Sequence, residues 1–219
     1  MSAQPLPIME HRQAIMHSIN SSTAVVISGK TGCGKSTQVP QFIYQDNKES
    51  VIAICEPRRL AAMSLAERVS QELNSKVGNI VGYQVGMDST RSSSTKICYM
   101  TYGIIIQQLL HNQKIPYTHI ILDEVHERSL DMDFTFVTLK KLLEHPSRRH
   151  IKIIIMSATL SSDDFSKYFA TNLVDAGCLF SFPKFNYKEE KYKILVSNGK
   201  GRELKEEVKL AVEIEYPTR

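Results

Sequence analysis

The sequence lacks the features of a disulfide-bonded, zinc-bound or membrane protein. Its four cysteines, Cys33, Cys55, Cys98 and Cys178, are far apart. This spacing fits neither a zinc site nor a disulfide framework, so a reducing, intracellular setting is expected. There is also no signal-type segment at the N-terminus and no apolar run of membrane-spanning length. A soluble protein with no membrane partner is therefore expected.

Positively charged residues only slightly outnumber negatively charged ones. The 219 residues include 27 Lys and Arg against 23 Asp and Glu, which gives a net charge of +4. This bias permits a polyanionic partner without proving one, because much of the positive charge can simply solvate helix faces. The length suits one sizeable domain with a large core.

Apolar strands alternate with helical segments along most of the chain. Strands are predicted at residues 25–27, 51–55, 80–85, 96–100, 119–123 and 152–156, and helices at 11–20, 36–44, 60–73, 104–111, 134–144 and about 163–169. Residues 88–94 are predicted to form a polar turn. This alternation implies right-handed crossovers and a mostly parallel sheet with helices on both faces, which is an α/β fold.

The two ends of the chain differ from its middle. Residues 1–20 are predicted to form a lead-in and a helix, and residues 21–183 the α/β domain. Residues 184–219 are rich in charge and interrupted by Gly199 and Gly201, so no firm fold is predicted for them. We expect this segment to lead towards a further domain.

Residues 29–37 form a complete Walker A loop between a predicted strand and a predicted helix. Gly29, Gly32 and Gly34 allow the backbone N–H groups to turn inward around phosphate oxygens. Lys35 is expected to reach the β- and γ-phosphates of a nucleoside triphosphate, and the Ser36 hydroxyl is expected to bind Mg²⁺. The other loop residues expected to line the nucleotide are Lys30, Thr31, Cys33 and Thr37. Cys33 is interpreted as a small filler, with a redox-sensing thiol as the alternative.

Two adjacent acids, Asp123 and Glu124, stand at the end of a predicted buried strand. Ligands of open α/β sheets bind at such strand ends. Asp123 is expected to hold Mg²⁺ through a water molecule, while Glu124 orients and deprotonates the attacking water. The competing interpretation is an acidic turn without a catalytic role, which would be the default for an isolated Asp-Glu pair.

Three more motifs complete an ordered series with the Walker loop. Residues 56–62 read Glu-Pro-Arg-Arg-Leu-Ala-Ala, residues 123–126 read Asp-Glu-Val-His, and residues 157–159 read Ser-Ala-Thr. From about residue 6 to residue 169, the chain resembles the DEAH/RHA family of superfamily 2 RNA helicases. The resemblance implies a RecA-like P-loop NTPase domain, the first of two, that uses ATP and Mg²⁺. RNA and a second RecA-like domain are the implied partners.

The resemblance also implies sites that contact RNA and adenine. Arg58 and Arg59 are similar to the family residues that hold the RNA backbone, and two solvated arginines are the alternative. Thr101 and Gly103 are similar to further contacts with the RNA backbone. Arg68 is similar to the family arginine that stacks on the adenine, a contact that a guanidinium plane makes without reading base edges.

Three residues are similar to those that couple the nucleotide site to unwinding: His126, Ser157 and Thr159. A plain turn after a strand is the alternative for the last two. The coupling depends on the second domain, which supplies the family's arginine finger. Because such a finger contributes about 10³–10⁵ in rate, the 219 residues alone are expected to bind nucleotide and turn it over poorly.

Some positions depart from the commonest family pattern. Tyr102 stands where an acidic residue is usual, and Val125 replaces an alanine. Residues 127–129 and 132–134 are closer to the branch of the family whose members carry a Tudor domain. That branch implies a role in the germline piRNA pathway, a cytoplasmic location in perinuclear granules, and Tudor-type or activator protein partners. A nuclear location stays open as an alternative.

Two other function classes compete with a helicase. One is an RNA clamp or scaffold in which nucleotide acts as a switch, and the other is a P-loop kinase. The intact set of Lys35, Asp123 and Glu124 argues against a dead scaffold site. A kinase would need an acceptor-binding lid, which the motif series does not suggest.

Overall fold

The computed structural model describes residues 6–111, 115–144, 150–158, 172–175, 196–198 and 202–204. The chain divides into two compact units, residues 1–181 and residues 182–219. In the second unit, the described residues form one antiparallel pair, β9 (Val196–Asn198) and β10 (Arg202–Leu204). The predicted helix at 163–169 lies outside the described residues.

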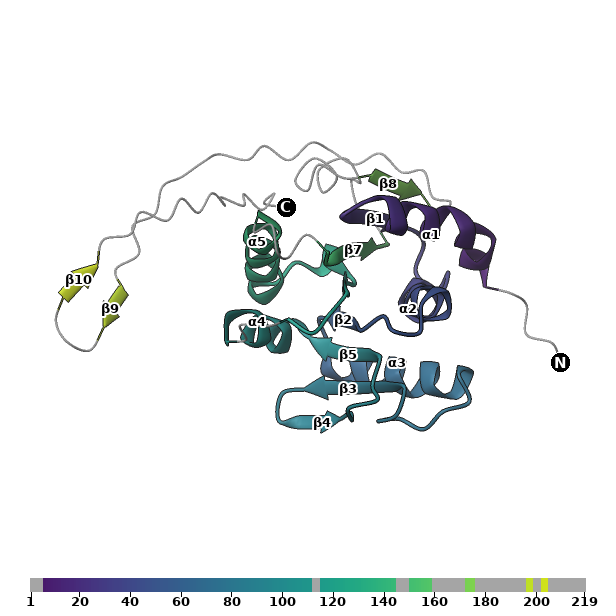
Figure 1. The fold of residues 1–219 in the computed structure, drawn as a ribbon, viewed down its shortest axis with the longest axis horizontal. Coiled ribbons are helices and arrows are strands. Elements are labelled where there is room, and N and C mark those ends of the chain that lie inside the picture. The colour runs from purple at the N-terminus through teal and green to yellow at the C-terminus, as the bar shows by residue number, and fades with distance from the viewer. Residues whose placement is uncertain are drawn as a thin grey trace, which may run out of the picture. The chain divides into compact units, whose positions relative to one another are not determined.

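An eight-stranded sheet organises the first unit (Figure 1). Its strands are β1 (Ala24–Ser28), β2 (Ile52–Glu56), β3 (Val81–Val85), β4 (Asp88–Thr90), β5 (Ile97–Thr101), β6 (His119–Leu122), β7 (Lys152–Ser157) and β8 (Asn172–Asp175). They lie in the order β4-β3-β5-β2-β6-β7-β1-β8, and every neighbouring pair is parallel except β3 and β4. The predicted mostly parallel sheet is confirmed.

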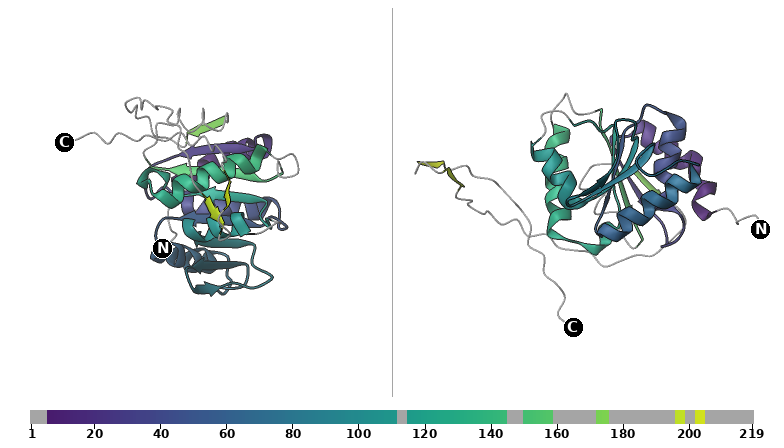
Figure 2. Two further views of the ribbon diagram at one scale, coloured as in Figure 1. Left: turned by 90° about the vertical axis from the view of Figure 1, so that its left-hand side faces the viewer. Right: turned by 90° about the horizontal axis from the view of Figure 1, so that it is seen from below.

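Helices cover both faces of this sheet (Figure 2). The helices of one face are η1 (Pro7–His11), α1 (Arg12–Ser21), α2 (Lys35–Asp46) and α3 (Arg59–Glu72), and those of the other are α4 (Tyr102–His111) and α5 (Leu130–Glu144). A short helix, η2 (Val125–Glu127), follows β6. Among the described residues, no helix is long and apolar enough to cross a membrane.

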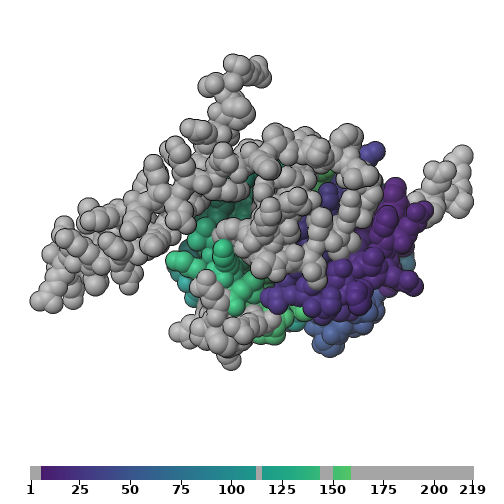
Figure 3. Space-filling model, turned by 90° about the horizontal axis from the view of Figure 1, so that it is seen from above, coloured from purple at the N-terminus to yellow at the C-terminus, as the bar shows by residue number. Residues whose placement is uncertain are grey.

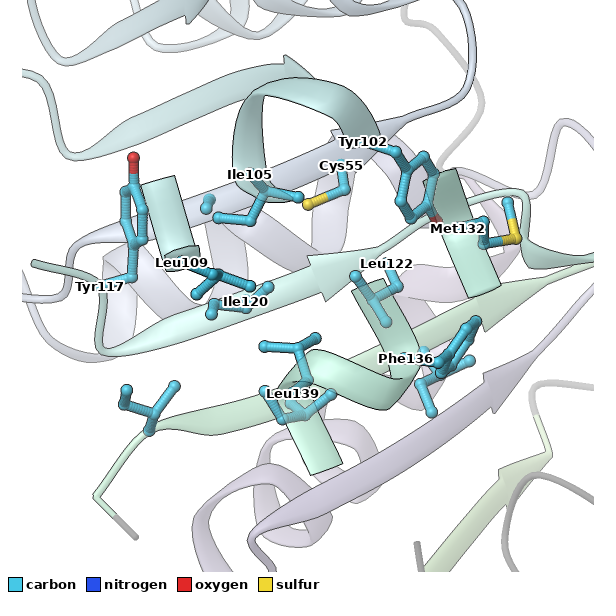
Figure 4. Close-up of a cluster of buried hydrophobic side chains, with 14 of the residues drawn as sticks. Cys55, Tyr102, Ile105, Leu109, Tyr117, Ile120, Leu122, Met132, Phe136 and Leu139 are labelled. Atoms are coloured by element: carbon cyan, nitrogen blue, oxygen red, sulfur yellow. The ribbon is translucent and has the colours of Figure 1, made fainter. Parts of the chain in front are cut away.

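The two faces of each central strand feed two separate cores. In β1, Val25 and Ile27 pack towards α1, α2 and α3, whereas Val26 packs towards α4 and α5. The second core is visible in Figure 4, where Ile105 of α4 and Leu139 of α5 belong to one cluster with Ile120 and Leu122 of β6. Burial of both faces explains why the central strands are almost continuously apolar.

Three details differ from the sequence predictions. Residues 88–90 form the antiparallel edge strand β4, so the prediction of a polar turn over 88–94 was wrong there. The side chains of β4 are largely exposed, so this strand has no apolar pattern in the sequence. Helix α5 begins at Leu130, four residues before the predicted start, and β8 was not predicted.

A proline inside α2 is matched by a tyrosine from the sheet. Pro40 has no N–H, so the carbonyl of Ser36, four residues earlier, has no helical partner. The hydroxyl of Tyr99, a fully buried residue of β5, donates to this carbonyl at 2.7 Å. The sheet thus supports the first turn of the helix that begins inside the Walker loop.

We predict that Tyr99→Phe lowers the free energy of unfolding by about 1–2 kcal/mol, because it leaves a partly buried carbonyl without a donor. The loss should shrink in a Pro40→Ala background, where residue 40 supplies the missing N–H. Urea denaturation followed by circular dichroism measures both values. Tyr83→Phe is the control, since the Tyr83 hydroxyl has no hydrogen-bond partner among the described residues. An equal loss in both backgrounds would contradict the pairing.

Candidate functional site

The Walker loop joins β1 to α2 and is shaped by glycines. Gly32 and Gly34 have φ angles of +81° and +102°, which side-chain-bearing residues rarely adopt. A Cβ atom on Gly34 would lie 2.9 Å from Cδ1 of Leu6. The backbone N–H of Ile8 also donates to the Cys33 carbonyl at 3.2 Å. The N-terminal segment, predicted only as a lead-in, therefore packs against the loop. Helices η1 and α1, purple in Figure 3, lie on the outer surface.

Lys35 lies inside the loop with 4% of its surface exposed. Its ammonium group donates to the carbonyls of Gly29 at 2.5 Å and Lys30 at 3.2 Å. The Cys33 side chain is buried beside it, with its sulfur 3.9 Å from Nζ of Lys35, as a small filler would be. A buried cation held by its own loop is placed to exchange these carbonyls for phosphate oxygens.

The first turn of α2 supplies the remaining loop residues. Ser36 and Thr37 are half-buried, and the Thr37 hydroxyl donates to the Gly34 carbonyl at 3.2 Å. Lys30, Thr31 and Gly32 are exposed at the tip of the loop. The N-terminus of a helix also favours anions, because its first N–H groups are unpaired and its dipole is positive there.

Asp123 lies directly after β6 and is completely buried. Its Oδ1 accepts a hydrogen bond from the backbone N–H of Glu124 at 2.9 Å, and its own N–H donates to the Cys55 carbonyl at 3.0 Å. The hydroxyl of Tyr102 donates to the Asp123 carbonyl at 2.7 Å. Tyr102, which departs from the family pattern, therefore holds the backbone of the expected metal ligand.

Glu124 has the left-handed backbone conformation, with φ of +52°. Burial, reinforced by the neighbouring Asp123 charge, raises the pKa of its carboxyl group. A raised pKa makes a carboxylate a stronger general base. Its Oε2 lies 3.2 Å from Nδ1 of His126, and the same nitrogen lies 3.5 Å from Oγ of Ser157.

Ser157 ends β7, between the strand of the acids and the strand of the Walker loop. Its backbone carbonyl accepts a hydrogen bond from the N–H of Gly29 at 3.1 Å. Glu124, His126, Ser157 and Gly29 thus form one continuous set of contacts. Thr159, the other residue of this motif, lies outside the described residues.

The four residues with expected RNA contacts gather at the carboxyl ends of two paired strands, β2 and β5. Arg58 is exposed by 73% at its side chain and pairs with Glu127 at 2.9 Å. Arg59 donates to the Val85 carbonyl at 3.3 Å. Thr101 ends β5, and Gly103 is in the first turn of α4, where an added Cβ would contact Asp131.

Arg68 lies on α3 and is connected to the Walker helix. Its Nε donates to Oε1 of Glu72 at 2.6 Å. The other carboxylate oxygen of Glu72 accepts hydrogen bonds from Gln38 and Gln41 of α2, at 2.9 and 2.7 Å. The Arg68 side chain is 66% exposed, so its guanidinium plane has an open face.

Residues 9–167 match the family model for the DEAD/DEAH box helicase. The chain belongs to the DEAD/DEAH box helicase family. Its relatives include proteins named "Probable ATP-dependent RNA helicase spindle-E". The protein from Drosophila willistoni is 45% identical over 172 residues, and that from Drosophila pseudoobscura pseudoobscura is 41% identical over 194. The protein from Anopheles gambiae is 44% identical over 169 residues.

These alignments cover 76%, 85% and 75% of this helicase-family chain but 12%, 14% and 11% of the relatives. The chain therefore spans a small part of their length. The helicase family and the RecA-like α/β fold predicted from the motifs are confirmed.

The residues of this family member fit Mg²⁺ and ATP. The Oδ2 atom of Asp123 is buried and has no donor among the described residues, as a ligand atom for a metal or its water would be. Within the described part of the chain, no group of three or more His, Cys, Asp or Glu side chains could form a metal cage. Mg²⁺ beside nucleotide phosphates needs no such cage, because it keeps several waters.

Three residues beside the site were not identified from the sequence: Glu56, Glu72 and Tyr102. From the sequence, Tyr102 is only a departure from the family pattern. The sequence contains one signal for Glu56, because it ends a buried apolar strand just as Asp123 follows one. Nothing in the sequence indicates that β2 and β6 are neighbours.

We predict that Lys35→Ala abolishes tight nucleotide binding, because it removes the point charge that faces the β- and γ-phosphates. Titration with a fluorescent nucleotide measures the affinity. Lys76→Ala is the matched control, since it removes the same charge from an exposed position outside the loop. If both variants bind alike, the assignment of Lys35 is wrong.

Proposed function

We propose that this chain is the ATP-binding lobe of an RNA helicase that couples ATP hydrolysis to RNA binding, remodelling or unwinding. One observation carries the proposal: the Arg58–Glu127 ion pair at 2.9 Å connects the expected RNA surface to the loop that holds Asp123 and Glu124. A helicase needs such a connection between the two sites. A simple nucleotide-binding protein does not.

The hydrolysis step uses groups that the fold already places. Lys35 would exchange the carbonyls of Gly29 and Lys30 for phosphate oxygens. Ser36 and Asp123 would hold Mg²⁺, which neutralises charge on the β- and γ-phosphates when bound. Glu124 would accept a proton from the attacking water, helped by its raised pKa.

Coupling is proposed to run through His126. This side chain lies between Glu124 and Ser157, and Ser157 in turn holds the Walker loop through Gly29. A change of charge at Glu124 during hydrolysis would alter the contact with His126. The same change would reach β7 and the residues that follow it.

The RNA surface is proposed to consist of Arg58, Arg59, Thr101 and Gly103. All four lie at the carboxyl ends of adjacent strands, and the arginines are exposed. Arginine and backbone N–H groups at such positions suit phosphate contacts, which position a strand without reading its sequence. RNA phosphates would compete with Glu127 for Arg58. We also propose that Arg68 stacks on the adenine, because its exposed side chain leaves one face of the guanidinium plane open.

The wider biology is also a proposal and rests on the relatives. Their names describe ATP-dependent RNA helicases called spindle-E, and this chain spans a small part of them. We propose a second RecA-like domain in the full-length protein, which supplies an arginine finger to the phosphates. From the same resemblance we propose a role in the germline piRNA pathway, with Tudor-type partners in perinuclear cytoplasmic granules.

We predict that Glu124→Gln keeps nucleotide binding and loses hydrolysis, because the amide can position a water molecule but cannot accept its proton. RNA-stimulated phosphate release and strand separation should be measured on a longer protein that includes the second domain. Parental hydrolysis in the variant would place the general base elsewhere. If the wild type binds RNA in response to nucleotide but separates no strands, the RNA-clamp alternative is correct.

We predict that Arg58→Ala or Arg59→Ala weakens binding to all RNA sequences alike. Each lost phosphate contact should flatten the log–log dependence of affinity on salt by about 0.7 for single strands. Fluorescence anisotropy across a salt series, on the longer protein without nucleotide, measures both quantities.

Lys76→Ala is the matched control for the arginine variants. It removes one exposed positive charge before β3, at the opposite edge of the sheet. If the RNA affinity and its salt dependence change no more in the arginine variants than in Lys76→Ala, Arg58 and Arg59 are ordinary solvated surface residues.

A further inference from the structure

An acidic side chain stands at an unfavourable place in α3. Glu72 is the last residue of this helix, where the negative end of the helix dipole disfavours a carboxylate. It also follows Arg68 by four residues, which is the order of charges that stabilises a helix less. Glu72 therefore contributes little to the helix that carries it, and the function proposed above assigns it no role.

Three side-chain donors converge on Glu72. Nε of Arg68 donates to Oε1 at 2.6 Å, and the amides of Gln38 and Gln41 donate to Oε2 at 2.9 and 2.7 Å. An ionised carboxylate can only accept hydrogen bonds, so both amides must present their N–H groups to it. Burial by itself would raise the pKa of Glu72, but the hydrogen bonds from Arg68, Gln41 and Gln38 together lower it. Glu72 is thus held as an anion at neutral pH.

The contact with Gln41 connects this anion to the nucleotide loop. Gln41 is only 4% exposed, and its amide also donates to the backbone carbonyl of Thr37, at 2.9 Å. Thr37 is one of the loop residues expected to line the nucleotide. The carboxylate of Glu72 is therefore fixed relative to the expected phosphate site as well as to its own helix.

The bond from Arg68 leaves its stacking surface free. Nε lies in the plane of the guanidinium group, so a hydrogen bond from it holds the group by an edge and covers neither face. The Arg68 side chain is 66% exposed, whereas that of Glu72 is 24% exposed. A long exposed side chain otherwise samples many rotamers. Fixing it before a ligand arrives removes part of the entropic cost of binding.

We propose that Glu72 is a positioning residue of the adenine site: it fixes the Arg68 guanidinium beside the Walker helix, in an orientation that can stack on the base. The inference rests on the proposed function, since it assumes that Arg68 stacks on adenine. Base and phosphates would then contact one connected unit, because Arg68, Glu72 and Gln41 lead back to the Walker loop.

The test compares the affinities of ADP and ribose 5-diphosphate, measured by calorimetry at one Mg²⁺ concentration. The ratio of the two affinities isolates the contribution of the adenine ring, because both ligands carry the same phosphates. We expect Arg68→Ala to lower this ratio by about threefold to tenfold, and Glu72→Ala to lower it by about twofold or more. The double variant should fall no further than Arg68→Ala, because Glu72 acts only through Arg68.

Glu67→Ala is the matched control, because it removes the same charge from an exposed position beside Arg68 on α3. Its ratio should equal that of the wild type. A purely structural role of Glu72 would weaken the binding of both ligands alike and leave the ratio unchanged. If Glu72→Ala does not fold, Glu72→Lys takes its place, since a cation suits the end of a helix and repels Arg68. Its ratio should fall as well.

Two outcomes overturn the positioning role of Glu72. One is a wild-type ratio in the Glu72 variant together with a reduced ratio in Arg68→Ala. The other is a double variant whose loss is the sum of the two single losses, since residues that act independently are additive. A wild-type ratio in Arg68→Ala would instead contradict the adenine stacking of the proposed function, and this inference with it.

Discussion

The parallel pairing of five central strands is the constraint on which the rest of this structure depends. Strands β5, β2, β6, β7 and β1 are consecutive neighbours, and all run in one direction. Their carboxyl ends therefore lie along one edge of the sheet. This edge carries Thr101, Glu56, Asp123, Ser157 and the start of the Walker loop, in that spatial order. Residues far apart in sequence become one site because the strand order interleaves them.

Several polar side chains at this edge of the sheet are buried. Lys35, Glu56 and Asp123 are each at most 4% exposed. A buried charged or polar group without a partner costs free energy, and backbone groups of the fold hold the Lys35 ammonium group and Oδ1 of Asp123. Tyrosines from β5 and α4 add two further contacts, to the backbone carbonyls of Ser36 and Asp123. The same contacts that stabilise the domain thus fix the geometry of the site.

Patterns of apolar residues predicted the central strands well, because a strand buried on both faces must be apolar along its length. They failed at β4, an exposed edge strand whose Asp88, Ser89 and Thr90 leave no apolar trace. The structure shows how closely β4 approaches β3 at Gly82, where an added Cβ would lie 2.5 Å from the Thr90 carbonyl oxygen. Helix α5 also begins earlier than predicted, at Leu130, whose side chain is exposed.

The sequence by itself determined the place of the Walker loop and of the Asp123-Glu124 pair along the chain. These motifs are local: a strand, a glycine-rich turn and a helix start can be identified from adjacent residues. Only the tertiary structure decided which side chains surround them. The support of the loop by Leu6 and Ile8 and the contact of Tyr102 with Asp123 both depend on which elements are neighbours. Strand order is set by non-local packing and pairing between distant segments, and no window of the sequence contains that information.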